Sequence, residues 1–149
     1  MALLTPDYDE FARAYDAGKN QIVYARLAAD LDTPVSLVLK LTGAAKDAFV
    51  LESVTGGEVR GRYSIIGMKP DVIWRCHATQ SQINRAARYD PDAFEDQVDD
   101  PLTALRALIA ESKIDLPADL PQAAAGLFGY LGYDMIRLVE HLQIGRAHV

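Results

Sequence analysis

Three consecutive residues, Leu51, Glu52 and Ser53, combine an apolar side chain, a carboxylate and a hydroxyl directly after Phe49-Val50. A site for a free amino acid needs such a set: an acceptor for the ammonium group, a donor for the carboxylate and an apolar wall for the side chain. A half-exposed strand shows the same alternation, with Glu52 and Ser53 simply facing water. From spacing alone, this second interpretation is favoured.

Other residues of reactive types form no recognised motif. The three histidines, at positions 77, 141 and 148, lie far apart, and no set of His, Cys, Asp or Glu has zinc-ligand spacing. Neither a Gly-x-Ser-x-Gly motif nor a Walker loop is present. The single cysteine, Cys76, lies in a strand-like run and is interpreted as a small buried residue. We therefore predict no catalytic residue and no metal site.

Two further segments have unusual composition. Residues 89–101 carry six carboxylates and no basic residue, in a spacing that matches no calcium-loop template. We interpret this acidic segment as a solvated connector that leads to a helix cap at Asp100. Residues 126–134 have glycine at every third position, but lack the strand–turn–helix context and the lysine of a phosphate loop. We predict a structural strand there, in which glycine permits close packing.

Helix caps and apolar periodicity predict four helices. The first begins at Thr5-Pro6 and ends at Gly18, and the second begins at Thr33-Pro34 and ends at Gly43. Asp100-Pro101 begins the third helix, and Asp134 caps the fourth. The side chains predicted to face the core from the last two helices are Leu102, Leu105, Leu108, Ile109, Met135, Leu138, Val139 and Leu142.

Five further strands are predicted from alternating polarity and turn residues. They lie at residues 21–28, on either side of the Gly56-Gly57 turn (49–54 and 60–67), and at 72–78 and 82–87. Short turns between strands indicate antiparallel pairing. The sequence therefore predicts an α+β fold with antiparallel β-sheets and flanking helices.

Composition excludes some classes of function. The chain has 149 residues, 50% of them hydrophobic, which is enough for the core of one domain. Its net charge of −6 argues against a nucleic-acid partner, because binding phosphates needs clustered Lys and Arg. No apolar run of about 18 residues predicts a membrane helix. A single cysteine and the absence of a signal peptide predict a cytoplasmic protein.

Two segments resemble a known family. Residues 50–67, VLESVTGGEVRGRYSIIG, are similar to the LLES…GRYS-x-IG hairpin of anthranilate synthase component I, although many members have Leu-Leu where this chain has Val50-Leu51. Residues 126–140 are similar to that family's G-x-FGY-x-GYD-x-x-R-x-x-E segment, with Arg137 and Glu140 at the expected offsets. The resemblance runs from Thr5 to Leu142. It implies that residues 1–142 are the N-terminal part of that fold, which is incomplete here.

The resemblance implies an enzyme, a lyase that converts chorismate to anthranilate and pyruvate in tryptophan biosynthesis. Ammonia would come from glutamine through an amidotransferase subunit, component II, and L-tryptophan would inhibit by feedback. The family's chorismate site and its Mg²⁺-binding glutamates lie in a part that this sequence lacks. No catalytic or metal residue is therefore transferred, and the chain alone is expected to be inactive.

The same resemblance assigns a ligand site. In the family, the hairpin lines the pocket for tryptophan, and Ser53 aligns with the serine that contacts this inhibitor. Leu51 and Glu52 are the next candidates, followed by Pro34 and Tyr63. Two alternatives stay open: aminodeoxychorismate synthase component I of the folate pathway, in which bound tryptophan is structural, and a non-catalytic amino-acid-binding module.

The last residues suggest a different origin. One back-translation of the final six residues, IGRAHV, is ATC GGA AGA GCA CAC GTC, which is part of a common sequencing-library adapter. We therefore expect residues 143–149 to be a non-native tail, read from adapter sequence at the end of a natural fragment. Coding sequence that continues beyond Val149 into family-like protein would refute the adapter hypothesis.

Overall fold

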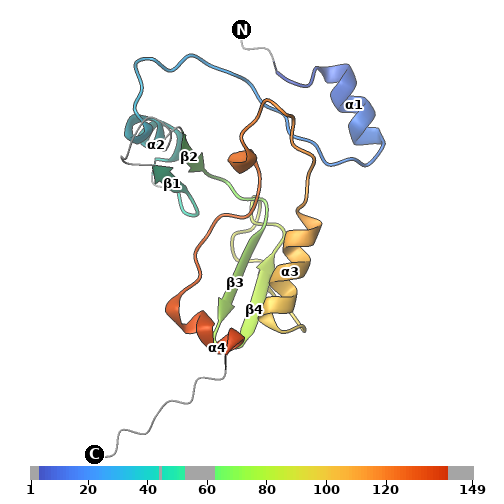
Figure 1. The fold of residues 1–149 in the computed structure, drawn as a ribbon, viewed down its shortest axis with the longest axis vertical. Coiled ribbons are helices and arrows are strands. Elements are labelled where there is room, and N and C mark those ends of the chain that lie inside the picture. The colour runs from blue at the N-terminus through green and yellow to red at the C-terminus, as the bar shows by residue number, and fades with distance from the viewer. Residues whose placement is uncertain (1–3, 44, 53–62, 141–149) are drawn as a thin grey trace, which may run out of the picture. The chain divides into compact units, whose positions relative to one another are not determined.

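The computed structural model describes residues 4–43, 45–52 and 63–140, which divide between two compact units. Unit 1 comprises Met1–Lys69 and Lys113–Ala125, and unit 2 comprises Pro70–Ser112 and Gly126–Val149. Each unit contains a small antiparallel sheet with helices (Figure 1). The predicted α+β class is confirmed. Predictions for Leu142 and for residues 143–149 lie outside the described residues.

Unit 1 begins with helix α1, Tyr8–Asp16, which is capped by Asp7 rather than Thr5. The Asp7 carboxylate accepts a hydrogen bond of 2.9 Å from the backbone N–H of Glu10. The strand predicted at residues 21–28 is wrong, since only Tyr24 pairs, in an isolated antiparallel bridge with Thr5. A single bridge cannot extend into a ladder without a neighbouring strand.

Helix α2, Pro34–Thr42, and the hairpin strands β1, Phe49–Glu52, and β2, Ser64–Gly67, confirm the second predicted helix and the strand pair after it. The strands pair antiparallel, and α2 packs against both of them. Gly43 ends the helix with a φ of 55°, a conformation that favours glycine. The predicted turn at residues 55–58 lies outside the described residues.

Unit 2 contains a three-stranded antiparallel sheet in the order β3, Ile73–His77, β4, Gln80–Asn84, and β5, Glu95–Asp96. The strand predicted at residues 82–87 is therefore shifted, because the chain turns back already at Ala78-Thr79 and leaves the sheet after Asn84. Strand β5 was not expected, since it lies within the acidic segment that we interpreted as a connector.

Helix α3, Pro101–Glu111, packs against β4 (Figure 1). Asp100 caps it as predicted, because its carboxylate accepts hydrogen bonds from the backbone N–H groups of Leu102 and Thr103. A hydrogen bond from the Thr103 side chain, followed by that from the Thr103 backbone N–H, holds the pKa of Asp100 below its ordinary value. The predicted buried face is confirmed at Leu108, whereas Leu102 and Leu105 are only partly buried and the other buried residues are Pro101 and Ala104.

The core of unit 2 forms where this face of α3 meets Ile83 of β4. Ile109, predicted to be buried, is 48% exposed. The spacing of large apolar residues thus located the helix but not the full set of its buried residues. The small Ala104, which that spacing does not select, is buried on the side of the helix that faces the sheet. Cys76 is half-buried, and burial raises the pKa of its thiol.

Two polar residues of β4 are fully buried. Asn84, with 0% of its surface exposed, donates from Nδ2 to the Asp90 carbonyl oxygen at 2.7 Å and accepts at Oδ1 from the Ala86 N–H at 2.8 Å. Ser81 is 1% exposed, and within the described ranges its hydroxyl has no hydrogen-bond partner. The two side chains therefore differ in what they contribute to stability.

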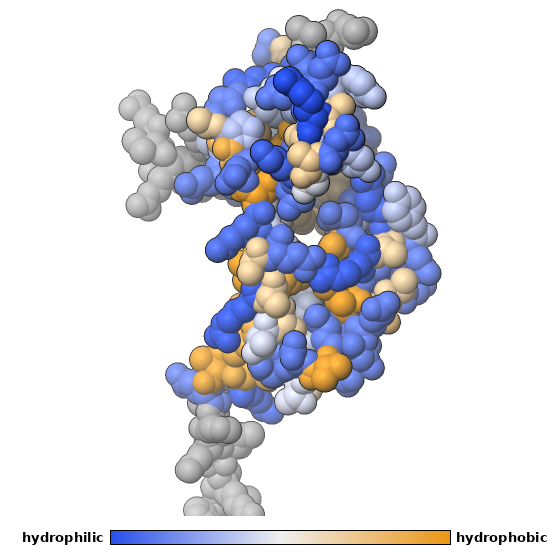
Figure 2. All heavy atoms as spheres, turned by 90° about the vertical axis from the view of Figure 1, so that its right-hand side faces the viewer, coloured by the Kyte–Doolittle hydropathy of each residue, from blue (hydrophilic) through white to orange (hydrophobic). Residues whose placement is uncertain are grey.

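The strand predicted at residues 126–134 is wrong. This stretch has no ladder partner among the described residues. Its last two residues belong to the short helical turn η2, Tyr133–Met135, and the short helix α4, Ile136–Val139, follows. Asp134 lies within η2 and does not cap α4; its carboxylate is 3.6 Å from the Arg137 guanidinium. Figure 2 shows apolar surface low in the view, at the height where Figure 1 labels α4. The exposed apolar side chains of residues 126–139 are Leu127, Phe128, Tyr130, Leu131, Tyr133, Ile136 and Val139.

Candidate functional site

The hairpin brings three of the predicted site residues to one end of the β1–β2 pair. Glu52 ends β1 and pairs with Ser64, the first residue of β2, while Leu51 pairs with Ile65. Tyr63 precedes β2 directly and is exposed. Ser53 lies outside the described residues. The register therefore places Leu51, Glu52 and Tyr63 at the same end of the sheet.

Strand alternation separates the first two of these side chains. Leu51 and Glu52 are consecutive in β1, so they point to opposite faces of the sheet, and both are exposed. The apolar side chain and the carboxylate therefore cannot line a single face. A ligand that touches both has to bind around the end of the hairpin.

At the other end of the hairpin, Gly67 allows a close contact between the two strands. Gly67 pairs with Phe49, and the phenylalanine ring lies over the glycine. A Cβ atom at Gly67 would lie 2.0 Å from the ring carbon Cε1 of Phe49, far inside van der Waals contact. The ring covers the backbone that a side chain would otherwise cover, an arrangement that stabilises glycine in a strand. This pair therefore supports the strand that carries Leu51 and Glu52.

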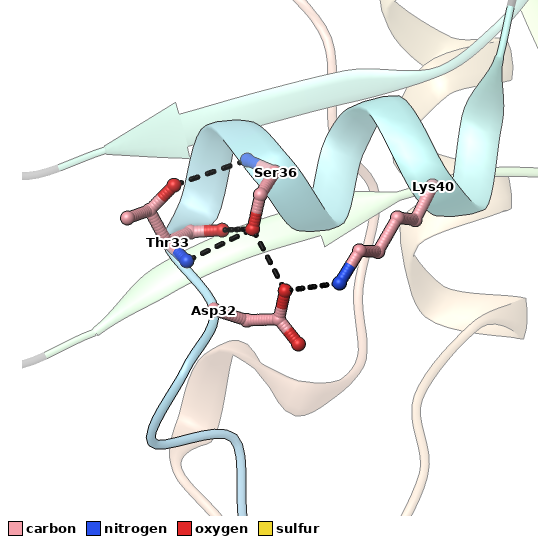
Figure 3. A network of polar contacts seen from close by, with 4 residues as sticks. All are labelled: Asp32, Thr33, Ser36 and Lys40. Carbon is pink, nitrogen blue, oxygen red and sulfur yellow. Dashed lines mark hydrogen bonds and ion pairs between the residues drawn. The ribbon is translucent and has the colours of Figure 1, made fainter.

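Pro34, the fifth predicted site residue, is the first residue of α2, where its missing N–H leaves no hydrogen bond unmade. The turn that holds it is capped in both directions. The Ser36 N–H donates to Thr33 Oγ1 at 3.1 Å, and the Thr33 N–H donates to Ser36 Oγ at 2.9 Å (Figure 3). Because α2 packs on both strands, this cap places Pro34 on the element that covers the hairpin.

Two charged residues extend this cap. The Ser36 hydroxyl donates to Asp32 Oδ1 at 2.9 Å, and the Lys40 ammonium forms an ion pair with the same oxygen (Figure 3). The hydrogen bond from Lys40, followed by that from Ser36, lowers the pKa of Asp32 below its ordinary value. Asp32 is thus ionised at neutral pH, and Ser36 and Lys40, the two residues that bond its carboxylate, both belong to α2.

Sequence reasoning missed this network, although one signal was present. Thr33 and Ser36 have the spacing of a capping box, with serine in place of the more usual Glu or Gln. Lys40 lies eight positions beyond Asp32, a separation that brings two residues together only after the chain has turned into the helix. No sequence pattern indicates that contact.

In the part of the chain that the structure describes, no group of three or more His, Cys, Asp or Glu side chains could hold a metal ion. None of the described helices is both long and apolar enough to span a bilayer.

Comparison with known proteins gives one consistent result. The chain is 69% identical over 135 residues to anthranilate synthase component 1 of Cereibacter sphaeroides, in a match that covers 91% of this chain and 27% of that protein. It is 37% identical over 135 residues to the protein of the same name from Acinetobacter calcoaceticus, covering 88% and 26%. The corresponding protein of Synechocystis sp. is 34% identical over 140 residues, covering 93% and 26%. No family model and no solved structure matches the chain.

These relatives define the class to which the segment belongs. The chain spans about a quarter of the length of the curated relatives that it matches. Over that quarter, the chain belongs to the anthranilate synthase component 1 family. The resemblance predicted from the hairpin and from residues 126–140 is therefore confirmed at the level of the family.

Proposed function

We propose that this chain is the regulatory and scaffolding part of an anthranilate synthase component 1. The observation that carries the proposal is the identity of 69% with the Cereibacter sphaeroides protein over nearly the whole chain. Every relative reported above has the same name, which favours this function over aminodeoxychorismate synthase and over a non-catalytic binding module.

In this proposal, the longer polypeptide converts chorismate to anthranilate and pyruvate in the cytoplasm. Ammonia is supplied from glutamine by the amidotransferase subunit, component II. Mg²⁺ and the catalytic residues belong to parts of the family sequence outside these 149 residues. The chain by itself then has no activity.

The L-tryptophan site is proposed at the end of the hairpin. Glu52 offers a carboxylate to the ammonium group, Ser53 offers a hydroxyl, and Leu51 offers an apolar surface to the indole, with Pro34 and Tyr63 beside them. The exposure of Leu51, Glu52 and Tyr63 at one end of the sheet supports this assignment. Inhibition is then a coupling free energy between this site and a distant active site, which requires two states with different affinity for tryptophan.

Replacing Ser53 with phenylalanine tests the site. In a polypeptide of the relatives' length that carries this segment, the added ring fills the space of the ligand, so we expect the tryptophan concentration for half-inhibition to rise by roughly tenfold or more. Anthranilate formation without tryptophan should be unchanged, and anthranilate fluorescence measures both quantities.

The matched control is Ser112→Phe, the same change at an exposed serine after α3. It should leave tryptophan inhibition as it is. Inhibition that is equally strong in the Ser53 variant and in the unchanged enzyme would rule out the assigned site. Product analysis tests the reaction separately, because aminodeoxychorismate in place of anthranilate would refute the proposed enzyme.

A further inference from the structure

Residues Lys113–Ala125, here called the strap, belong to unit 1, although the residues directly before and after them belong to unit 2. The described hydrogen bonds within the strap's own backbone are local: the Leu120 N–H donates to the Pro117 carbonyl at 3.0 Å, and the Ala124 N–H to the Pro121 carbonyl at 2.8 Å. None of the thirteen strap residues is buried. Apolar burial, usually the largest contribution to the placement of a segment, is therefore weak here.

In place of apolar burial, polar contacts to one strap residue, Asp119, hold the strap. The Tyr24 hydroxyl donates to Asp119 Oδ2 at 2.7 Å, and Arg26 Nη2 donates to the same oxygen at 2.9 Å. Arg26 Nη2 also reaches the backbone carbonyl of Asp119 at 3.0 Å. Both the side chain and the backbone of Asp119 are thus held by two residues that lie more than ninety positions earlier in the chain.

The partner of the strap is itself fixed at this point. Tyr24 and Thr5 exchange two backbone hydrogen bonds of 2.8 Å each, which makes the amino-terminal segment double-stranded at Tyr24. The strap therefore contacts the amino-terminal segment at Tyr24, where backbone hydrogen bonds to Thr5 fix that segment. A continuous series of polar contacts thus runs from the Thr5–Tyr24 bridge through the Tyr24 hydroxyl to the Asp119 carboxylate and the Arg26 guanidinium.

We propose that the carboxylate of Asp119 is a latch that holds the strap on the amino-terminal segment of unit 1. The Tyr24 hydroxyl most strongly, and the Asp119 backbone N–H and Arg26 more weakly, hold the pKa of Asp119 below its ordinary value, so the carboxylate is ionised at neutral pH. The side chains of Arg26 and Asp119 are 68% and 53% exposed, so their attraction is weakened by water and by salt. The latch is therefore weak enough to open without unfolding the unit.

Hydrogen–deuterium exchange followed by mass spectrometry, on the whole chain at low concentration, tests the latch. In Asp119→Asn, amide exchange in peptides that contain Thr5, Tyr24 and Leu120 should be roughly threefold to tenfold faster, since charge-assisted contacts at an exposed site are worth little more. Tyr24→Phe, which removes only one hydroxyl, should produce a smaller increase in the same peptides.

Asp115→Asn is the matched control. It removes one charge from the same exposed strap, at a residue that makes no recorded contact with Tyr24 or Arg26, and it should leave exchange unchanged. Raising NaCl to about 1 M should speed exchange in the unchanged chain but not in Asp119→Asn, because salt screens only a pair that exists. The proposal would be overturned if Asp119→Asn and Asp115→Asn exchanged at the same rate. It would also be overturned if the exchange rate of the unchanged chain did not depend on the salt concentration.

Discussion

Replacing Asn84 with alanine is expected to lower the free energy of unfolding of unit 2 by about 2–4 kcal/mol. The side chain is fully buried and is hydrogen-bonded at both ends, to the Asp90 carbonyl and to the Ala86 N–H. Alanine removes both of these hydrogen bonds and leaves an unfilled space at a fully buried position, so the lost contacts and the cavity both lower stability. The turn between Ala86 and Asp90 keeps its own backbone hydrogen bonds but loses its attachment to the side chain of Asn84.

The fluorescence of Trp74 during urea unfolding measures this loss. Trp74 is the chain's single tryptophan; it lies in β3 of the same sheet, and its indole N–H donates to Gln97 Oε1 at 2.8 Å. Ser81→Ala is the control, because it also truncates a fully buried polar side chain of β4, but one whose hydroxyl has no recorded partner. It should change stability by less than about 0.5 kcal/mol, or increase it. Similar losses in the two variants would show that hydrogen bonding at Asn84 is not the cause.

Replacing Gly67 with alanine is expected to destabilise the hairpin by about 1–3 kcal/mol, the usual cost of forcing an extra carbon into a filled space. The new methyl group would lie 2.0 Å from Cε1 and 2.4 Å from Cζ of the Phe49 ring. The ring has to leave its place over the strand, and the register that holds Leu51 and Glu52 weakens with it. Faster amide exchange in β1 and β2, measured by mass spectrometry, would report the change.

Two further variants isolate the steric cause. Gly129→Ala adds the same methyl group where nothing lies within 4 Å, so hairpin exchange should stay as it was. Combining Gly67→Ala with Phe49→Ala removes the clash, and the double variant should be more stable than the sum of the two single effects predicts. Strict additivity would mean that the ring and the glycine do not interact.

The parts of the fold predicted correctly are those fixed by local chemistry. Thr33-Pro34, Gly43 and Asp100 mark helix ends because each acts through its own backbone or that of its neighbours. Two local predictions, the helix caps at Thr5 and Asp134, are wrong, and the errors in the strands occur where a distant partner decides. Residues 21–28 and 126–134 have the composition of strands, but a strand also needs a neighbour, and the described residues provide only Thr5 opposite Tyr24.

The candidate site was predictable to the same extent. Alternation located the strand that ends at Glu52, and the resemblance selected Leu51, Glu52, Ser53, Pro34 and Tyr63; which of them touch tryptophan stays a prediction. The contacts that fix the surroundings of the site were not visible in the sequence. The pairs of Lys40 with Asp32, of Phe49 with Gly67 and of Arg26 with Asp119 exist only after folding has brought distant positions together.

The small size of the β1–β2 sheet affects any ligand that binds to it. Two strands under one helix are close to the lower limit of what stays ordered in water. A molecule that recognises only the ordered pair therefore stabilises it by mass action, by about 2.7 kcal/mol at one hundred times its dissociation constant. Part of the ligand's intrinsic binding free energy is used to order the two strands. Binding should therefore be accompanied by an increase in the local order of β1 and β2. An inhibitor bound there would act by restricting the motion of these two strands as well as by occupying the site.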